Sequence, residues 1–224
     1  MTRLRMWGRP NSICTQRALW ACVEAGVEVD LTLASAWVGP QGNVYNGFKP
    51  YGIVDTPDYR AMNPNGTLPT IKDSDFVLWE SNAILAYVAQ KYAPERLYGG
   101  RLETFAKASQ WMNWTNEHLE PPLHTLVMDL VRLPPAERSA ERAEAARQAM
   151  LRPLGVLEAH LSKQPHVAGD AFSLGDIPPG AAIQRWRLFD IARPATPAID
   201  AWMARLATRE GFRRHVAPAE FHLV

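Results

Sequence analysis

The spacing of hydrophobic residues changes several times along the first part of the chain. Residues 4–7 are a short, mostly apolar stretch, and residues 27–33 alternate valine and leucine with polar residues, so both are predicted strands. Between them, apolar residues recur at helical spacing over 15–23, with Ser12 placed as the N-cap and Gly26 as the stop. A helix between two strands in this order predicts a parallel βαβ unit.

Two more strands and a helix follow a long polar segment. Residues 67–72 and 76–79 are rich in branched and aromatic side chains and are separated by a short polar turn, which predicts a hairpin. Residues 84–92 then place their apolar side chains on one helical face. The segment 34–62 is rich in glycine, proline and asparagine, with a short helical turn expected at 58–62. The expected order is βαβ, loop, ββα.

Strand signals almost vanish in the second part of the chain. Helices are expected at 102–130, 136–161, 196–207 and 210–215. Ser173 with Asp176 three residues later matches a capping box, which predicts a buried helix running to about residue 189. The predicted fold class is α+β, with a βαβ-ββα domain at 1–92, a linker at 93–100 and an all-α domain at 101–224.

Composition and charge narrow the class of protein. The net charge of +1 disfavours nucleic acid or an anionic membrane as the main partner. No run of about eighteen apolar residues is present, and the apolar run at the start is too short for a signal peptide, so a soluble cytoplasmic protein is expected. Cys14 and Cys22 lie roughly 12 Å apart along one predicted helix, too far for a disulfide. The pattern contains no metal-ligand cluster, nucleotide loop or catalytic triad spacing.

Pro69 is unusual because it stands at the start of a predicted strand. Proline has no N–H to contribute to a sheet ladder and is confined to edges, bulges and strand starts. The preceding residue, Leu68, would keep a backbone N–H and carbonyl that the strand does not pair, and such groups need a partner. An extended peptide ligand could supply one.

Three motifs make the chain resemble the cytosolic glutathione transferases, and in particular their bacterial serine-type, theta/nu-like members. They are Asn63-Pro-Asn-Gly-Thr-Leu-Pro69, Leu78-Trp-Glu-Ser-Asn-Ala-Ile84 and Ala168-Gly-Asp-Ala-Phe-Ser-Leu-Gly-Asp-Ile177. They occur in the family's order and span nearly the whole chain. The resemblance implies a thioredoxin-like first domain, glutathione as co-substrate and no metal.

The resemblance also implies roles for the hairpin and for the helix that follows it. Pro69 would be a cis-proline, and the backbone of Leu68 would pair with the cysteinyl part of glutathione. Glu80 and Ser81 would hold its γ-glutamyl end, where a helix N-terminus suits the carboxylate and an acid suits the ammonium. A simpler alternative is that Ser81 only caps its helix and Glu80 is a first-turn acid.

The residue that activates the sulfur is less sharply defined. Ser12 falls where serine-type members place their catalytic hydroxyl, and Asn11 is adjacent. Many bacterial relatives have Ser-x-Asn here, whereas this chain has Ser12-Ile13-Cys14. Cys14 could therefore carry a mixed disulfide with glutathione, as in cysteine-type classes. Equally, Ser12 could be a plain N-cap and Cys14 a small apolar filler.

The remaining expectations concern the substrates and the assembly. Lys49 is expected to bind the glycyl carboxylate of glutathione, with Asn46 and Gln41 behind it. A hydrophobic pocket between the domains is expected for the second substrate. Its expected lining residues, some of which could instead be packing residues, are Trp7, Trp37, Trp111, Trp114 and His118.

The resemblance implies a homodimer that conjugates glutathione to a hydrophobic electrophile, a detoxification reaction. The alternatives are a glutathione-dependent disulfide oxidoreductase and a non-catalytic binding module of the same fold.

Overall fold

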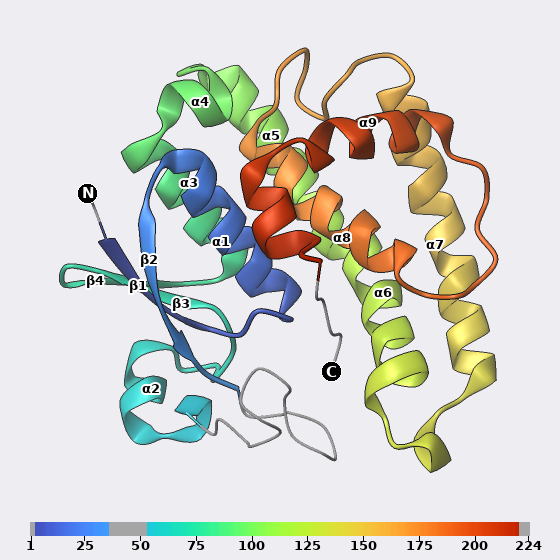
Figure 1. Ribbon diagram of the computed structural model, residues 1–224, viewed down its shortest axis with the longest axis horizontal. Helices are drawn as coiled ribbons and strands as arrows, with labels where there is room; N and C mark the ends of the chain where they lie inside the picture. Colours follow the sequence, from blue (N-terminus) through green and yellow to red (C-terminus); the bar gives the residue numbers. More distant parts are fainter. Residues whose placement is uncertain (1–2, 36–52, 220–224) are drawn as a thin grey trace.

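The computed structural model describes residues 3–35 and 53–219 of the chain. Within them, the first part forms a four-stranded sheet in the order β2-β1-β3-β4, made of β1 (Arg3–Gly8), β2 (Glu28–Leu33), β3 (Thr70–Asp73) and β4 (Phe76–Trp79). β1 pairs in parallel with β2 and antiparallel with β3, and β3 pairs antiparallel with β4. The predicted βαβ unit and hairpin thus join in one sheet (Figure 1).

Both faces of the sheet are covered. The covering elements are α1 (Ile13–Ala25), the 3-10 turn η2 (Ile53–Asp55), α2 (Pro57–Met62) and α3 (Ser81–Tyr92). Leu4 and Met6 of β1 belong to the core that contains α1 and α3, whereas Trp7 packs with Tyr59 of α2 in a separate cluster. Leu4 and Met6 thus face one side of the sheet and Trp7 the other, because successive side chains of a strand point to opposite faces.

α1 ends where expected, at Gly26, whose φ of 69° lies in the left-handed region that glycine tolerates.

The second part of the described chain is built from helices. They are α4 (Pro94–Tyr98), α5 (Leu102–Trp114), the π-helical turn η3 (Thr115–Leu119), α6 (Glu120–Val127), the π-helical turn η4 (Met128–Arg132), the 3-10 turn η5 (Pro135–Glu137), α7 (Ala140–Leu161), the 3-10 turn η6 (Leu174–Asp176), α8 (Ile177–Arg187), α9 (Pro197–Ala207) and the π-helical turn η7 (Phe212–Val216). The capping box predicted at Ser173 and Asp176 is present, and it begins the η6–α8 segment.

One buried cluster runs through both parts of the molecule. α1 lies at its centre, between α3 on one side and α8 and η7 on the other (Figure 1). Trp20 of α1 is fully buried, and its ring centroid lies 5.9 Å from that of Phe172 and 5.2 Å from that of Phe212. The helix that starts at Ser12 is therefore fixed by side chains from the far end of the chain.

The structure differs from the predicted elements in several places, and the strand predicted at 67–72 begins only at Thr70. The predicted linker contains the short helix α4, whose Leu97 is completely buried. The helix expected at 102–130 continues from α5 to η4 but widens to a π-helical turn before Pro121 and Pro122, because proline lacks an N–H and crowds the preceding turn. The helix expected from 136 begins at Ala140, with the side chain of Ser139 as its N-cap.

Candidate active site

Ser12 lies where the loop after β1 turns into α1. Its hydroxyl accepts a hydrogen bond from the backbone N–H of Thr15 at 3.4 Å, so Ser12 is the N-cap of α1, as predicted. The loop can turn this tightly because residue 8 is glycine: a Cβ on Gly8 would lie 2.5 Å from Cγ2 of Thr15. Ser12 also lines a cavity. Since a hydroxyl that accepts one bond can still donate its proton, Ser12 can both cap the helix and donate to a ligand.

Buried polar side chains hold the segment that precedes β3. Asn63, which is fully buried, donates from Nδ2 to the carbonyl oxygen of Thr67 at 3.0 Å and to Oγ1 of Thr70 at 3.1 Å. The hydroxyl of Tyr59 donates to the same Thr67 carbonyl at 2.7 Å. These bonds fix the backbone on both sides of residues 68 and 69.

Leu68 and Pro69 lie between these two anchored threonines. The peptide bond that joins them is cis. Among the described residues, none hydrogen-bonds to the backbone N–H or carbonyl of Leu68. The backbone of Leu68 therefore offers the donor and the acceptor that an extended ligand requires.

Glu80 and Ser81 lie at the start of α3. Glu80 occupies the N-cap position, but its exposed side chain makes no capping hydrogen bond. Ser81 is the first residue of the helix and is 5% exposed. Ser81 is therefore inside the helix and does not occupy its N-cap position.

The backbone of Glu80 is also strained. Its φ of 71° is rare for a residue with a side chain and costs on the order of 1–3 kcal/mol. Strain of this kind is often kept where a side chain or N–H must be aimed at a ligand.

Cys14 lies in the first turn of α1, close to the first turn of α3. Burial raises the pKa of its thiol, and this effect outweighs the nearby Arg17 guanidinium and the hydrogen bond from the Ser81 side chain, which both lower the pKa. Burial also raises the pKa of Cys22 to about 12. Both cysteines are free thiols, and neither has the depressed pKa typical of a redox-active cysteine.

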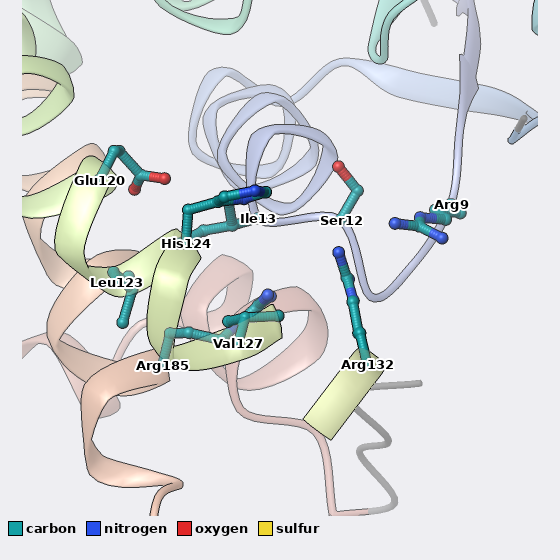
Figure 2. Close-up of a pocket in the computed structure, with 9 residues that line it drawn as sticks. All are labelled: Arg9, Ser12, Ile13, Glu120, Leu123, His124, Val127, Arg132 and Arg185. Atoms are coloured by element: carbon teal, nitrogen blue, oxygen red, sulfur yellow. The ribbon is translucent and has the colours of Figure 1, made fainter. Parts of the chain in front are cut away.

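The cavity beside Ser12 lies between the loop after β1 and the helices of the second part (Figure 2). It is lined by Arg9, Ser12, Ile13, Glu120, Leu123, His124, Val127, Arg132 and Arg185. Glu120 forms an ion pair with Arg17, which is completely buried and also donates to Oδ1 of Asn116 at 3.3 Å. This ion pair connects α1 to α6 at the side of the cavity.

Arg185 anchors the loop that carries Ser12. One of its guanidinium nitrogens donates to the backbone carbonyl of Asn11 at 3.1 Å and to Oε1 of Gln16 at 2.8 Å. Asn11 itself is completely buried and is not among the residues that line the cavity, and its place among the catalytic residues stays a prediction. The backbone carbonyl of Asn11 connects the loop to α8 through Arg185.

Trp7, Trp111, Trp114 and His118, which are predicted to line the second-substrate pocket, are not among the residues that line the cavity beside Ser12. Trp7 faces Tyr59 on the opposite side of the sheet. Trp111 and Trp114 make an edge-on contact with ring centroids 4.9 Å apart, and both line a separate hollow of about 450 Å³ between α5 and α7. His118 is exposed, with its ring 5.7 Å from that of Trp114.

The three residues of α5 and η3 thus share one side, as predicted, but none of them lines the cavity beside Ser12. Helical spacing establishes which residues share a side, and it does not establish which neighbour that side meets. Lys49, Asn46, Gln41 and Trp37 lie outside the described residues.

The sequence patterns do not predict the three arginines that line the cavity. Arg9 is only three residues from Ser12, so its place near the site could be expected from the sequence. Arg132 and Arg185 come from η4 and α8, far from Ser12 in the chain, and carry no local motif. Only the packing of the second part against the loop brings them together.

No group of three or more His, Cys, Asp or Glu side chains in the 3–35 and 53–219 ranges could hold a metal ion. None of the helices in those ranges combines the length and the apolar character needed to cross a bilayer.

Comparison with known proteins matches this geometry to one family. Residues 11–91 match the model of the glutathione S-transferase N-terminal domain, and residues 119–210 match that of the C-terminal domain. The chain is 32% identical over 217 residues to glutathione S-transferase GstB of Escherichia coli K12, covering 95% of this chain and 97% of that one. It is 31% identical to glutathione S-transferase 4 of Zea mays, covering 92% of this chain and 88% of that one.

Among solved structures, the theta-class glutathione S-transferase of Xanthomonas axonopodis pv. citri with glutathione bound superposes with a TM-score of 0.87, at 38% identity and with full coverage of both chains. The structure of the same Xanthomonas protein without ligand superposes with a TM-score of 0.80, at 33% identity and with full coverage of both chains. The chain belongs to the cytosolic glutathione transferase superfamily.

Proposed function

We propose that this protein binds glutathione along Leu68, Glu80 and Ser81, holds its sulfur as a thiolate at Ser12, and transfers it to a small electrophile in the adjacent cavity. The observation that carries the proposal is the position of Ser12, which caps α1 and lines the cavity at the same time. The Xanthomonas structure, which has glutathione bound and matches the whole chain, supports the identity of the thiol substrate.

The reaction requires the thiolate, because a free thiol titrates near pH 8.5 and the thiol form is a poor nucleophile. The hydroxyl of Ser12 can donate to the sulfur, and the N-terminus of α1 adds a positive partial charge beside it. The thiolate then attacks the electrophilic carbon, a C–S bond forms, and the leaving group departs with its electron pair. The proton of the thiol passes to solvent.

The other end of glutathione carries both an ammonium and a carboxylate. The exposed carboxylate of Glu80 can accept from the ammonium, and the first N–H groups of α3, with the Ser81 hydroxyl, can donate to the carboxylate. The backbone of Leu68 would pair with the cysteinyl residue between them. Lys49 remains our proposal for the glycyl carboxylate.

A disulfide oxidoreductase is the second candidate, and the raised pKa of Cys14 weighs against it. The strained backbone of Glu80 disfavours a non-catalytic binding module that does not hold glutathione. Such strain lowers stability, and it is usually kept only where it serves a binding site. We further propose that this protein is a detoxifying enzyme of the cytoplasm and that it works as a homodimer. Its second substrate would be a small hydrophobic electrophile.

Titration calorimetry with glutathione, together with conjugation of 1-chloro-2,4-dinitrobenzene, tests the function. The wild type should bind glutathione and conjugate the dinitrobenzene faster than glutathione alone. Ser81→Ala should weaken binding at least tenfold, whereas Ser162→Ala, an exposed serine at the end of α7, should leave it unchanged. Absence of glutathione binding by the wild type would overturn the proposal.

A further inference from the structure

Arg185 of α8 connects the second part of the chain to the loop that carries Ser12. It is 4% exposed and lines the same cavity as Ser12 (Figure 2). A single guanidinium nitrogen, Nη2, donates to the carbonyl oxygen of Asn11 at 3.1 Å and to Oε1 of Gln16 at 2.8 Å. These two acceptors lie on either side of Ser12 in the chain, so one nitrogen holds the loop before Ser12 and the first turn of α1 after it.

Other hydrogen bonds of this loop come from its own segment. The N–H of Ser12 donates to the carbonyl of Arg9 at 3.1 Å, and the N–H of Gln16 donates to the carbonyl of Ser12 at 2.9 Å. The carbonyl of Asn11 belongs to the same peptide group as the N–H of Ser12, and Arg185 joins that group to α8. Because a peptide group is planar, holding both its carbonyl and its N–H fixes the direction in which the chain enters Ser12. This direction determines where the rotamers of Ser12 place its hydroxyl.

α8 is a firm support for Arg185. The capping box of Ser173 and Asp176, both completely buried, begins the segment that leads into this helix. Gly180 lets α8 approach α1 closely, since a Cβ at this position would lie 3.2 Å from Cη2 of the fully buried Trp20. The planar guanidinium also loses less conformational freedom per hydrogen bond than a lysine does. The side chain can therefore hold the loop in one geometry.

We propose that Arg185 is a positioning residue, which sets the orientation of the Ser12 hydroxyl toward the sulfur of glutathione through the backbone of Asn11. The proposal rests on the glutathione transferase function proposed above. A donor stabilises an anionic sulfur only over a narrow range of distance and angle, and small displacements at a reacting centre lower the rate strongly. Loss of Arg185 should therefore impair ionisation of the sulfur and its transfer, while the tripeptide is still bound at the start of α3.

Arg185→Met keeps the approximate length of the side chain and removes its donors. The pKa of the bound thiol, followed by the absorbance of the thiolate, should rise, and the kcat for 1-chloro-2,4-dinitrobenzene should fall at least tenfold. The Kd of S-methylglutathione, whose sulfur carries no proton, should stay within about threefold of the wild-type value. Arg185→Lys, which can still donate, should retain part of the activity. Gln16→Leu, which removes one of the two acceptors, should lower kcat by a smaller factor.

Arg96→Met is the matched control. Arg96 of α4 donates from Nη2 to the carbonyl of Ala25, the last residue of α1, at 2.8 Å. Its loss removes the same kind of bond, from an arginine to a backbone carbonyl, at the other end of the same helix. This variant should therefore keep the thiol pKa and the kcat of the wild type. Circular dichroism establishes that each variant is folded.

A double-mutant cycle with Ser12→Ala separates positioning from a direct effect of the guanidinium charge on the sulfur. If Arg185 acts through Ser12, Arg185→Met should change kcat by less than about twofold once the hydroxyl of Ser12 is absent. Should Arg185→Met fail to fold, Arg185→Lys and Gln16→Leu take its place in the cycle.

Losses of kcat that multiply in the double variant would overturn the positioning role. A wild-type kcat and thiol pKa in Arg185→Met would overturn it as well. In both cases the wild type would still bind and conjugate glutathione. Failure of the wild type to bind glutathione at all would instead overturn the proposed function.

Discussion

The side chain of Ser81, the first residue of α3, lowers the pKa of the thiol of Cys14 in the first turn of α1. The two helices whose N-termini we assign to opposite ends of glutathione pack against each other. Cys14 lies between them as a half-buried thiol whose pKa is raised by burial.

Cys14→Ala should leave the rate of conjugation within about threefold of wild type, because a protonated, largely packed thiol contributes little to transition-state charge. Any disulfide-exchange activity should change by the same small factor. Steady-state assays of both reactions on the wild type, Cys14→Ala and Cys14→Ser would measure this. A selective loss of disulfide exchange in Cys14→Ala would revive the oxidoreductase alternative.

Ser12→Ala should lower the kcat of conjugation at least tenfold, since one donor to an anionic centre is typically worth roughly 10²–10³ in rate. It should also lower the free energy of unfolding by about 1 kcal/mol, because α1 loses its N-cap. Ser139→Ala is the matched control: Ser139 caps α7 by accepting from the N–H of Arg142 at 3.1 Å. That variant should lose similar stability with full activity, and equal activity in the two variants would remove the role given to Ser12.

Glu80→Gly should separate stability from binding. Glycine tolerates the φ of 71°, so the variant should gain on the order of 1 kcal/mol in free energy of unfolding, while the Kd for glutathione rises at least tenfold. Ser74→Gly, at the turn of the hairpin with a φ of 55°, should gain stability with no effect on glutathione. Urea unfolding and calorimetry measure the two quantities. Unchanged affinity in Glu80→Gly would contradict the site assigned to Glu80.

Asp73→Asn should weaken the tie between the hairpin and α3. Burial alone would raise the pKa of Asp73, but hydrogen bonds from Lys91 and Tyr87, both at 2.6 Å, and from Tyr92 hold it below its usual range. The stability that this carboxylate contributes is therefore present above pH about 3.9, the usual pKa of aspartate, and is lost as the pH falls through the lower folded-state pKa.

Because Asp73→Asn removes the charged acceptor, it should lower the free energy of unfolding by on the order of 2 kcal/mol at pH 7. The free energies of unfolding of the wild type and the variant should converge as the pH falls below 4. Urea unfolding across pH 3–7 would measure the difference. Asp55→Asn provides the control, because Asp55 pairs with Arg60 at 3.0 Å on the exposed surface and should cost less than about 1 kcal/mol. A gap between wild type and Asp73→Asn that does not vary with pH would contradict this account.

Local patterns were sufficient to predict most of the elements and one side of the site. Ser12, Gly26 and the Ser173 capping box act within a few residues of their own position, so they could be recognised in the sequence. The same holds for Leu68 and Glu80, which lie at the ends of predicted elements.

The other side of the site could not be predicted because it depends on contacts between distant segments. Arg132 and Arg185 meet the loop of Ser12 only after the helical part packs on α1. Trp111 has the spacing of a pocket residue, yet its side meets α7 and not the cavity. Periodicity carries no information about which of two neighbours a helical side will face.

Trp20 has a consequence for the modularity of the chain. Separate family models match residues 11–91 and 119–210, but the indole of Trp20 in the first range packs on Phe172 in the second and on Phe212 just beyond it. Replacing the second part of the chain by that of a relative would remove Phe172 and Phe212, the aromatic partners of Trp20. Chimaeras between relatives should fold only when the residues around Trp20 are transferred with it, so during evolution the two parts must have been constrained to diversify together.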